Sequence, residues 1–300
     1  MTKISVEKAL MKARSHTNKG ENIEAQRLYK NVLLEFPKNM RAQKELALLN
    51  KNCSTIQTQI AHDNEVNNII NLYNSGKFLT VIKKAQELLE QSPKTFKVWN
   101  ILGASAAEKG MENKAIDAYK KCILLNPNYP DAYYNMGNTL HNLNKHDEAV
   151  ISYKKAVSIK PDYAEAYYNM GLVFRDQGKL DDAIKSYESF ILLRPNYADV
   201  YNNLGNLFQD LGKLEKSIIA FKKAISIKPD YANAFCNMGI SLKNQGNYTC
   251  AVKAFKKAIL LKPNFAEAYN NMGNALRNQD KLKEAIIAYQ KAISIKPDYE

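Results

Sequence analysis

The sequence predicts an all-α solenoid in which antiparallel helix pairs stack on one another, and three observations lead to this prediction. Seven prolines recur at intervals of 34 residues, at Pro93, Pro127, Pro161, Pro195, Pro229, Pro263 and Pro297. Between successive prolines, apolar residues recur at the i, i+3, i+4, i+7 spacing of one helix face. Gly, Asn or Asp interrupts each interval near its middle. A fixed period of this length indicates one supersecondary unit that buries its apolar face on the next copy.

Each regular interval contains two predicted helices, as residues 96–129 illustrate. The apolar face of the first helix is formed by Trp99, Leu102, Gly103 and Ala106. The face of the second helix is formed by Ala115, Tyr119 and Cys122, and Pro127 ends this helix because its ring cannot continue the hydrogen-bond ladder. The residues between the two helices tolerate a left-handed backbone, and they are Gly110, Asn144, Gly178, Gly212, Gly246 and Asp280 in the six copies.

The chain divides into four predicted parts. Residues 1–50 form an irregular unit with an extra helix, residues 51–61 form a hinge or linker where the phase of the repeat breaks, and residues 62–95 form a degenerate repeat. Six regular repeats follow, at 96–129, 130–163, 164–197, 198–231, 232–265 and 266–299. A repeat array has no single central core, so function is expected on a repeated surface.

The regular part resembles the tetratricopeptide repeat family. The resemblance rests on the period, on an aromatic residue followed by Leu or Met and Gly (Tyr133, Met136 and Gly137), and on a later Ala, Tyr and closing Pro. It implies a right-handed superhelix whose first helices line a concave groove. In this family such grooves bind proteins or peptides.

One line of polar residues in the first helices is the candidate site. Counted from the first residue of each repeat, position 6 is asparagine in five repeats, at Asn135, Asn169, Asn203, Asn237 and Asn271; we call these five residues the asparagine ladder. Position 9 adds Asn138, Asn206 and Asn274. A helical wheel places both positions opposite the buried stripe, where no core needs them. Because an amide both donates and accepts hydrogen bonds, the ladder is expected to hold an extended polypeptide by its main chain.

Acidic residues flank the ladder at positions 2 and 13. They are Asp131, Glu165, Asp199, Asp176 and Asp210. They favour basic or neutral polypeptides over nucleic acid. The leading hypothesis is therefore a protein-interaction scaffold that is not an enzyme.

The ladder also resembles the one that O-linked N-acetylglucosamine transferases use to grip substrate polypeptides. This resemblance implies an alternative, namely the N-terminal substrate-recognition region of a larger glycosyltransferase or another transferase. The chain ends directly after a closing Pro-Asp-Tyr with no polar capping helix, and this ending favours a longer parent protein.

The net charge of +13 supports a third hypothesis only weakly. Lysine pairs recur on the second helices, for example Lys222 and Lys223, and could contact nucleic acid. Only six of the 43 basic residues are Arg, the residue best suited to bidentate phosphate contacts, so nucleic-acid binding is the least favoured hypothesis.

No catalytic or metal-binding pattern is found in the sequence. The four histidines and four cysteines lack metal-like spacing, no Gly-rich phosphate loop occurs, and no cofactor is predicted. The chain has no apolar run of membrane-spanning length and no signal peptide, so we expect a cytoplasmic protein with reduced thiols. The sequence leaves the oligomeric state open.

Overall fold

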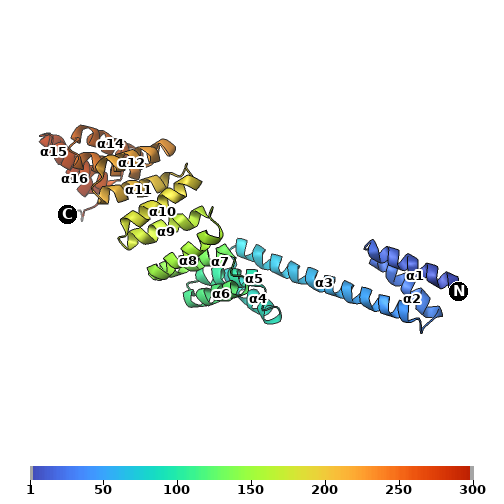
Figure 1. Cartoon of the computed structure of the whole chain (residues 1–300). Helices are drawn as coiled ribbons and strands as arrows, with labels where there is room; N and C mark the ends of the chain where they lie inside the picture. The colour runs from blue at the N-terminus through green and yellow to red at the C-terminus, as the bar shows by residue number, and fades with distance from the viewer. Residues whose placement is uncertain (1–2, 298–300) are drawn as a thin grey trace. The chain divides into compact units, whose positions relative to one another are not determined.

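The computed structural model describes residues 3–297, and within this range all regular structure is α-helical, in sixteen helices (Figure 1). The predicted all-α solenoid is confirmed. The chain separates into two compact units, which we call the N-terminal unit (Met1–Pro93) and the C-terminal unit (Lys94–Glu300).

The N-terminal unit contains four helices. They are α1 (Lys3–Asn18), α2 (Asn22–Glu35), α3 (Met40–Asn74) and α4 (Phe78–Gln91). Helices α1 and α2 form a hairpin, and the start of α3 packs on it through Ala42 and Leu49, which are buried in the same cluster as Tyr29 and Val32. The end of α3 packs against α4, where the Tyr73 and Phe78 rings meet edge to face with centroids 5.5 Å apart.

The hinge predicted at 51–61 is wrong, because α3 continues without interruption through these residues. Residues 40–74 contain no Gly or Pro that would end a helix. The hydroxyl groups of Ser54, Thr55 and Thr58 bond to carbonyl groups three or four residues earlier, so they are satisfied within the helix. The predicted extra helix and the first helix of the degenerate repeat are therefore one helix. Its additional length accounts for the break in the 34-residue period.

The C-terminal unit is a stack of six helix pairs, which we number as repeats 1 to 6. The pairs are α5 (Phe96–Ala107) with α6 (Glu112–Leu125), α7 (Pro130–Asn142) with α8 (His146–Ile159), α9 (Ala164–Asp176) with α10 (Leu180–Leu193), α11 (Ala198–Asp210) with α12 (Leu214–Ile227), α13 (Ala232–Asn244) with α14 (Tyr248–Leu261), and α15 (Ala266–Arg277) with α16 (Leu282–Ile295). The last two residues of repeat 6 as bounded from the sequence, 298 and 299, lie outside the described range.

The same frame holds each pair together. The first helix contributes a glycine at position 8 that lies directly against the aromatic ring at position 24 of the second helix. In repeat 3, a Cβ atom on Gly171 would lie 2.5 Å from Cε1 of Tyr187, so no larger residue fits without a shift. The turn between the helices has a left-handed residue in every repeat, as predicted, with φ from 57° at Asn144 to 82° at Gly246.

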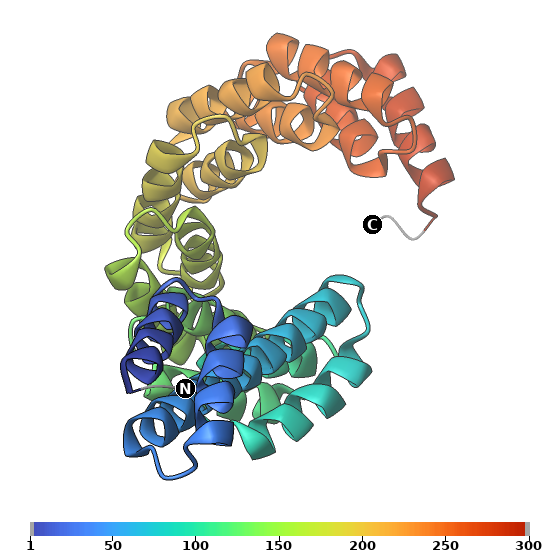
Figure 2. The same cartoon turned by 90° about the vertical axis from the view of Figure 1, so that its right-hand side faces the viewer.

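The stack curves with its first helices on the concave side. Successive first helices contact one another directly, α5 with α7, α7 with α9, α11 with α13 and α13 with α15. Among the described residues, no comparable contact joins successive second helices. The second helices therefore spread apart on the convex side, and Figure 2 shows the curved path of the repeats from yellow to red.

Candidate functional site

The asparagine ladder lies on the first helices, and each of its side chains is half-buried between neighbouring repeats. Nδ2 of Asn135 donates to Oδ1 of Asn100 at 3.2 Å, and Nδ2 of Asn203 donates to the Tyr168 hydroxyl at 3.1 Å. Both partners occupy position 5 of the preceding repeat. The prediction that packing does not need the ladder is therefore wrong, because the ladder ties each repeat to the one before it.

Asn169 and Asn237 each make two such bonds. Nδ2 of Asn169 donates to the Tyr134 hydroxyl at 3.2 Å and to Oδ1 of Asn138 at 2.8 Å. The same nitrogen of Asn237 donates to Asn202 at 3.2 Å and to Asn206 at 3.0 Å. The position 5 partners are part of the site, although they were not among the residues predicted from the sequence. The signal that could have identified them is the repeated Asn or Tyr at that position.

Asn271 departs from this pattern because its position 5 partner would be Cys236, which is not an equivalent acceptor. Its Nδ2 instead donates to the carbonyl of Glu267 at 3.1 Å within its own helix. Its Oδ1 accepts a hydrogen bond from Nζ of Lys243 at 3.0 Å. The ladder therefore consists of four side chains in register and a fifth that is turned.

These bonds decide which atoms remain for a partner. In Asn169, Asn203 and Asn237 the nitrogen is used between repeats, and Oδ1 accepts no hydrogen bond from the described residues. In the position 9 asparagines it is the oxygen, and not the nitrogen, that bonds to neighbouring side chains. Oδ1 of Asn138 accepts from the Tyr153 hydroxyl at 2.7 Å, and Oδ1 of Asn274 accepts from Tyr289 at 2.9 Å. The ladder thus offers acceptors, and position 9 offers donors.

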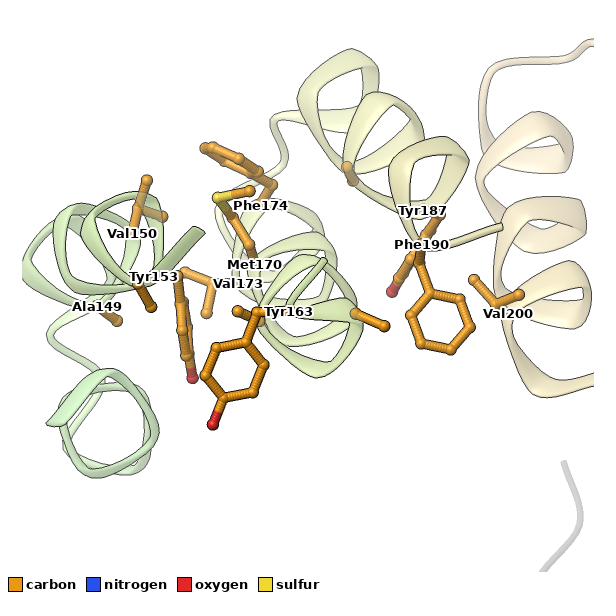
Figure 3. Packing of buried hydrophobic residues seen from close by; sticks show 14 of the residues in the cluster. Ala149, Val150, Tyr153, Tyr163, Met170, Val173, Phe174, Tyr187, Phe190 and Val200 are labelled. Atoms are coloured by element: carbon orange, nitrogen blue, oxygen red, sulfur yellow. The ribbon is translucent and has the colours of Figure 1, made fainter. Parts of the chain in front are cut away.

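Repeat 3 lacks a position 9 amide, because Leu172 stands there. Its position 24 residue, Tyr187, is fully buried, and its hydroxyl oxygen has no hydrogen-bond partner in the described part of the chain. The hydroxyls of Tyr153, Tyr163 and Tyr187 point to the same side in Figure 3, away from Phe174.

Most of the predicted acidic residues already have partners. Asp131 accepts a hydrogen bond from Tyr163 at 3.0 Å, and Asp199 accepts one from Tyr231 at 2.6 Å. Glu165 forms an ion pair with Arg194. Asp210 is exposed, and no partner for it is found within residues 3–297.

Asp176 lies in a cluster with His141 and Arg175, whose side chains reach its carboxylate at 2.9 Å each. Partial burial acts to raise the pKa of Asp176, but the hydrogen bonds from His141 and Arg175 outweigh it and the pKa is lowered. Position 12, which supplies His141, Arg175 and Lys243, thus places basic groups beside the ladder. These groups were not among the residues predicted from the sequence.

The lysines that precede the closing prolines have a packing role. The ammonium groups of Lys160, Lys228 and Lys262 lie 4.7, 5.0 and 4.6 Å from the ring centroids of Tyr163, Tyr231 and Phe265. Each is a cation–π contact between turn residues. Each of these lysines is therefore held beside the aromatic ring that follows its closing proline.

The described residues offer little for other chemistry. They contain no group of three or more His, Cys, Asp or Glu side chains that could hold a metal ion. Burial raises the pKa of the Cys122 and Cys236 thiols to about 12, so both are poor nucleophiles at neutral pH. None of the helices between residues 3 and 297 combines the length and the apolar character that a membrane crossing requires.

Comparison with protein families gives matches along the whole C-terminal unit. A model described as TPR repeat matches residues 137–174, 171–212, 205–246 and 241–280. Models described as Tetratricopeptide repeat match residues 96–129, 118–151 and 266–299. No curated protein matches the chain.

Several solved structures share the fold. MamA is 28% identical with a TM-score of 0.53, and the match covers 54% of this chain and 95% of MamA. YrrB, described as a TPR protein with an unusual peptide-binding site, is 25% identical with a TM-score of 0.55 over 62% of this chain and 95% of its own. The C-terminal part of a TPR repeat-containing protein from Cytophaga hutchinsonii, at 17% identity, has a TM-score of 0.67 over 78% of this chain and 96% of its own.

Proposed function

Because the chain belongs to the tetratricopeptide repeat family over residues 96–299, we propose that it is a protein-interaction scaffold. In this proposal an extended polypeptide lies along the asparagine ladder on the concave side of the C-terminal unit. The observation that carries the proposal is the orientation of the ladder amides. In the four ladder residues that are in register, from Asn135 to Asn237, the nitrogens are fixed by the preceding repeat. Their oxygens remain available to accept main-chain N–H groups.

Fixed amides suit this task better than free ones. A side chain that is already hydrogen-bonded on one side has lost most of its rotamer freedom before a partner arrives, so binding costs less conformational entropy. The position 9 amides of Asn138 and Asn206 add donors for main-chain carbonyl groups. Every polypeptide main chain offers both kinds of group. The site is therefore expected to bind many extended polypeptides with little dependence on their sequence.

The number of contacts sets the length of polypeptide that binds. Each hydrogen bond contributes only about 1 kcal/mol net, so several must form together. Neighbouring helices pack about 10 Å apart, so the four ladder residues in register span roughly 30 Å, the length of about nine extended residues. Shorter peptides should bind weakly. The basic groups of Arg175 and Lys243 are held by Asp176 and Asn271, so a neutral polypeptide is accepted as well as a basic one.

The test measures binding of a fluorescently labelled, neutral peptide of about 24 residues, built from Ala, Ser and Thr, to the full chain. The triple variant Asn169→Ala, Asn203→Ala, Asn237→Ala should weaken binding at least tenfold, because it removes three acceptors. The matched control is Asn128→Ala, Asn196→Ala, Asn264→Ala, which changes exposed turn asparagines in the same array and should bind as the unaltered protein does.

Circular dichroism must accompany this measurement, because the ladder also joins the repeats. The triple ladder variant should keep its helix content at the temperature of the assay. Undiminished binding by a folded ladder variant would contradict the proposal.

A further inference from the structure

The convex side of the C-terminal unit has clefts between successive second helices. One cleft, of about 510 Å³, lies between α8 and α10 with α9 as its floor. A second, of about 600 Å³, lies between α14 and α16 with α15 as its floor. The two clefts are structurally equivalent, because the same repeat positions line them.

The floor of each cleft is apolar and comes from positions 4, 7 and 11 of the first helix. These residues are Tyr167, Met170 and Phe174 in one cleft and Tyr269, Met272 and Leu276 in the other. Figure 3 shows Met170 and Phe174 on the same side as Val150, opposite the tyrosine hydroxyls. The clefts therefore lie on the opposite side of the stack from the asparagine ladder.

The rims of the clefts have excess positive charge. In the first cleft, the two carboxylates have lysine partners, Asp147 with Lys179 at 3.5 Å and Asp182 with Lys185 at 3.9 Å. This leaves Lys154, whose ammonium lies 5.9 Å from the Phe174 ring. The rim of the second cleft carries Lys256 and Lys291 against the single carboxylate of Glu284.

Each second helix also carries a large, strongly exposed aliphatic side chain on its outer face, and two of these residues, Ile151 and Ile287, line the clefts. The residue is isoleucine at position 22 of repeats 2, 4 and 6 and leucine at position 29 of repeats 1, 3 and 5. The six residues are Leu124, Ile151, Leu192, Ile219, Leu260 and Ile287, with exposures from 65% for Ile287 to 86% for Leu192. Both positions face directly away from the buried side of the helix. Next to them lie exposed lysine pairs such as Lys222 and Lys223.

We propose that this convex surface is a second interaction site, and that it binds an acidic amphipathic polypeptide segment. Apolar side chains of the segment would enter the clefts and cover the exposed Leu and Ile residues, while its carboxylates would pair with the lysines on the rims. Charge complementarity favours an acidic partner. A regular row of exposed aliphatic residues favours a partner with apolar side chains, which a nucleic-acid backbone does not supply.

The geometry also favours a polypeptide over a lipid surface. Because the stack curves and its second helices spread apart on the convex side, a flat bilayer can touch only a few repeats at once. A chain can follow the curve and occupy one cleft after another.

The experiment uses the full chain and a synthetic 20-residue amphipathic peptide of Glu and Leu as the probe. Two variants are compared. One is Leu192→Ser with Leu260→Ser, which places at position 29 the residue that repeats 2, 4 and 6 already carry (Ser158, Ser226 and Ser294), so the fold is expected to tolerate it. The other replaces Lys154, Lys155, Lys256 and Lys257 by Gln.

Each variant should weaken binding of the acidic peptide at least fivefold, and the lysine variant should also lower the salt dependence of binding. The ladder variant Asn169→Ala, Asn203→Ala, Asn237→Ala should leave it unchanged, so failure of this proposal and failure of the ladder are separable. Three results would each overturn the proposal. They are no binding of the acidic peptide, equal binding of a Lys–Leu peptide of the same pattern, and a preference for duplex DNA or phosphatidylserine vesicles that the leucine variant leaves intact.

Discussion

Repeats 2, 4 and 6 differ from repeats 1, 3 and 5 on the two open sides of the stack and agree in its interior. On the concave side, repeat 2 has Asn138 where repeat 3 has Leu172. On the convex side, repeat 2 exposes Ile151 in the middle of its second helix, and repeat 3 exposes Leu192 near the end of its own. The interior frame, a glycine of the first helix directly against an aromatic ring of the second, is the same in both kinds of repeat.

The comparison distinguishes the residues that stabilise the helix pairs from the surface residues that are available for binding. The frame fixes the distance between the two helices of a pair, since a ring lies directly on a glycine. The alternating positions change the hydrogen bonds between repeats and the place of the exposed aliphatic residues, while the helix bounds agree to within one residue. Substitutions at equivalent positions in the two kinds of repeat therefore test whether the interior is shared and the surfaces differ.

The largest effect is expected from the shared frame. Gly171→Ala in repeat 3 and Gly205→Ala in repeat 4 should each destabilise the protein by about 1–3 kcal/mol through overpacking, since the new Cβ meets a fully buried ring. Urea unfolding followed by circular dichroism measures the loss, with Glu188→Ala at an exposed position of α10 as the control. A loss in one kind of repeat alone would show that the frame is not shared.

A smaller effect should distinguish the two kinds of repeat. Tyr153→Phe removes the hydroxyl that donates to Asn138 and should cost about 1 kcal/mol. Tyr187→Phe, at the same position of repeat 3, removes a buried hydroxyl without a partner and should be neutral or stabilising. The same urea titration compares the two variants, and an equal loss in both would contradict the difference seen between repeats 2 and 3.

The smallest effect is expected at Cys236, which interrupts the partners of the ladder. Cys236→Asn places at position 5 the residue that repeats 1 and 4 carry as Asn100 and Asn202, both buried. Nδ2 of Asn271 should then leave the Glu267 carbonyl and bond to the new amide, with a gain of about 0.5–1 kcal/mol. Side-chain amide NMR of Asn271 follows the change. Cys250→Asn, at an exposed cysteine, serves as the control and should leave that signal where it is.

Much of the fold could be predicted because the same local sequence pattern occurs in all six repeats. Proline, the left-handed turn residue and the glycine at position 8 each have a steric reason that needs no knowledge of the tertiary structure. The hinge at 51–61 could not be predicted in this way, because a break in phase looks the same in a sequence whether a loop or a longer helix causes it. The absence of Gly and Pro from residues 40–74 was the signal for the longer helix.

The candidate site was predicted only in part. A helical wheel finds the side of a helix that faces away from its own partner, and it placed the asparagine ladder there. It does not show how closely the next first helix approaches. That approach half-buries Asn169 and Asn203 and commits their nitrogens to Tyr134 and Tyr168. The partners lie one repeat away, so a single repeat cannot reveal them.

The most direct measurement of the central claim compares two labelled peptides of the same neutral sequence, one unmodified and one methylated at every main-chain nitrogen. The ladder oxygens of Asn169, Asn203 and Asn237 can only accept hydrogen bonds, so in the proposed binding mode they need main-chain N–H groups. The methylated peptide should therefore lose at least tenfold in affinity. Equal binding of the two peptides would contradict it.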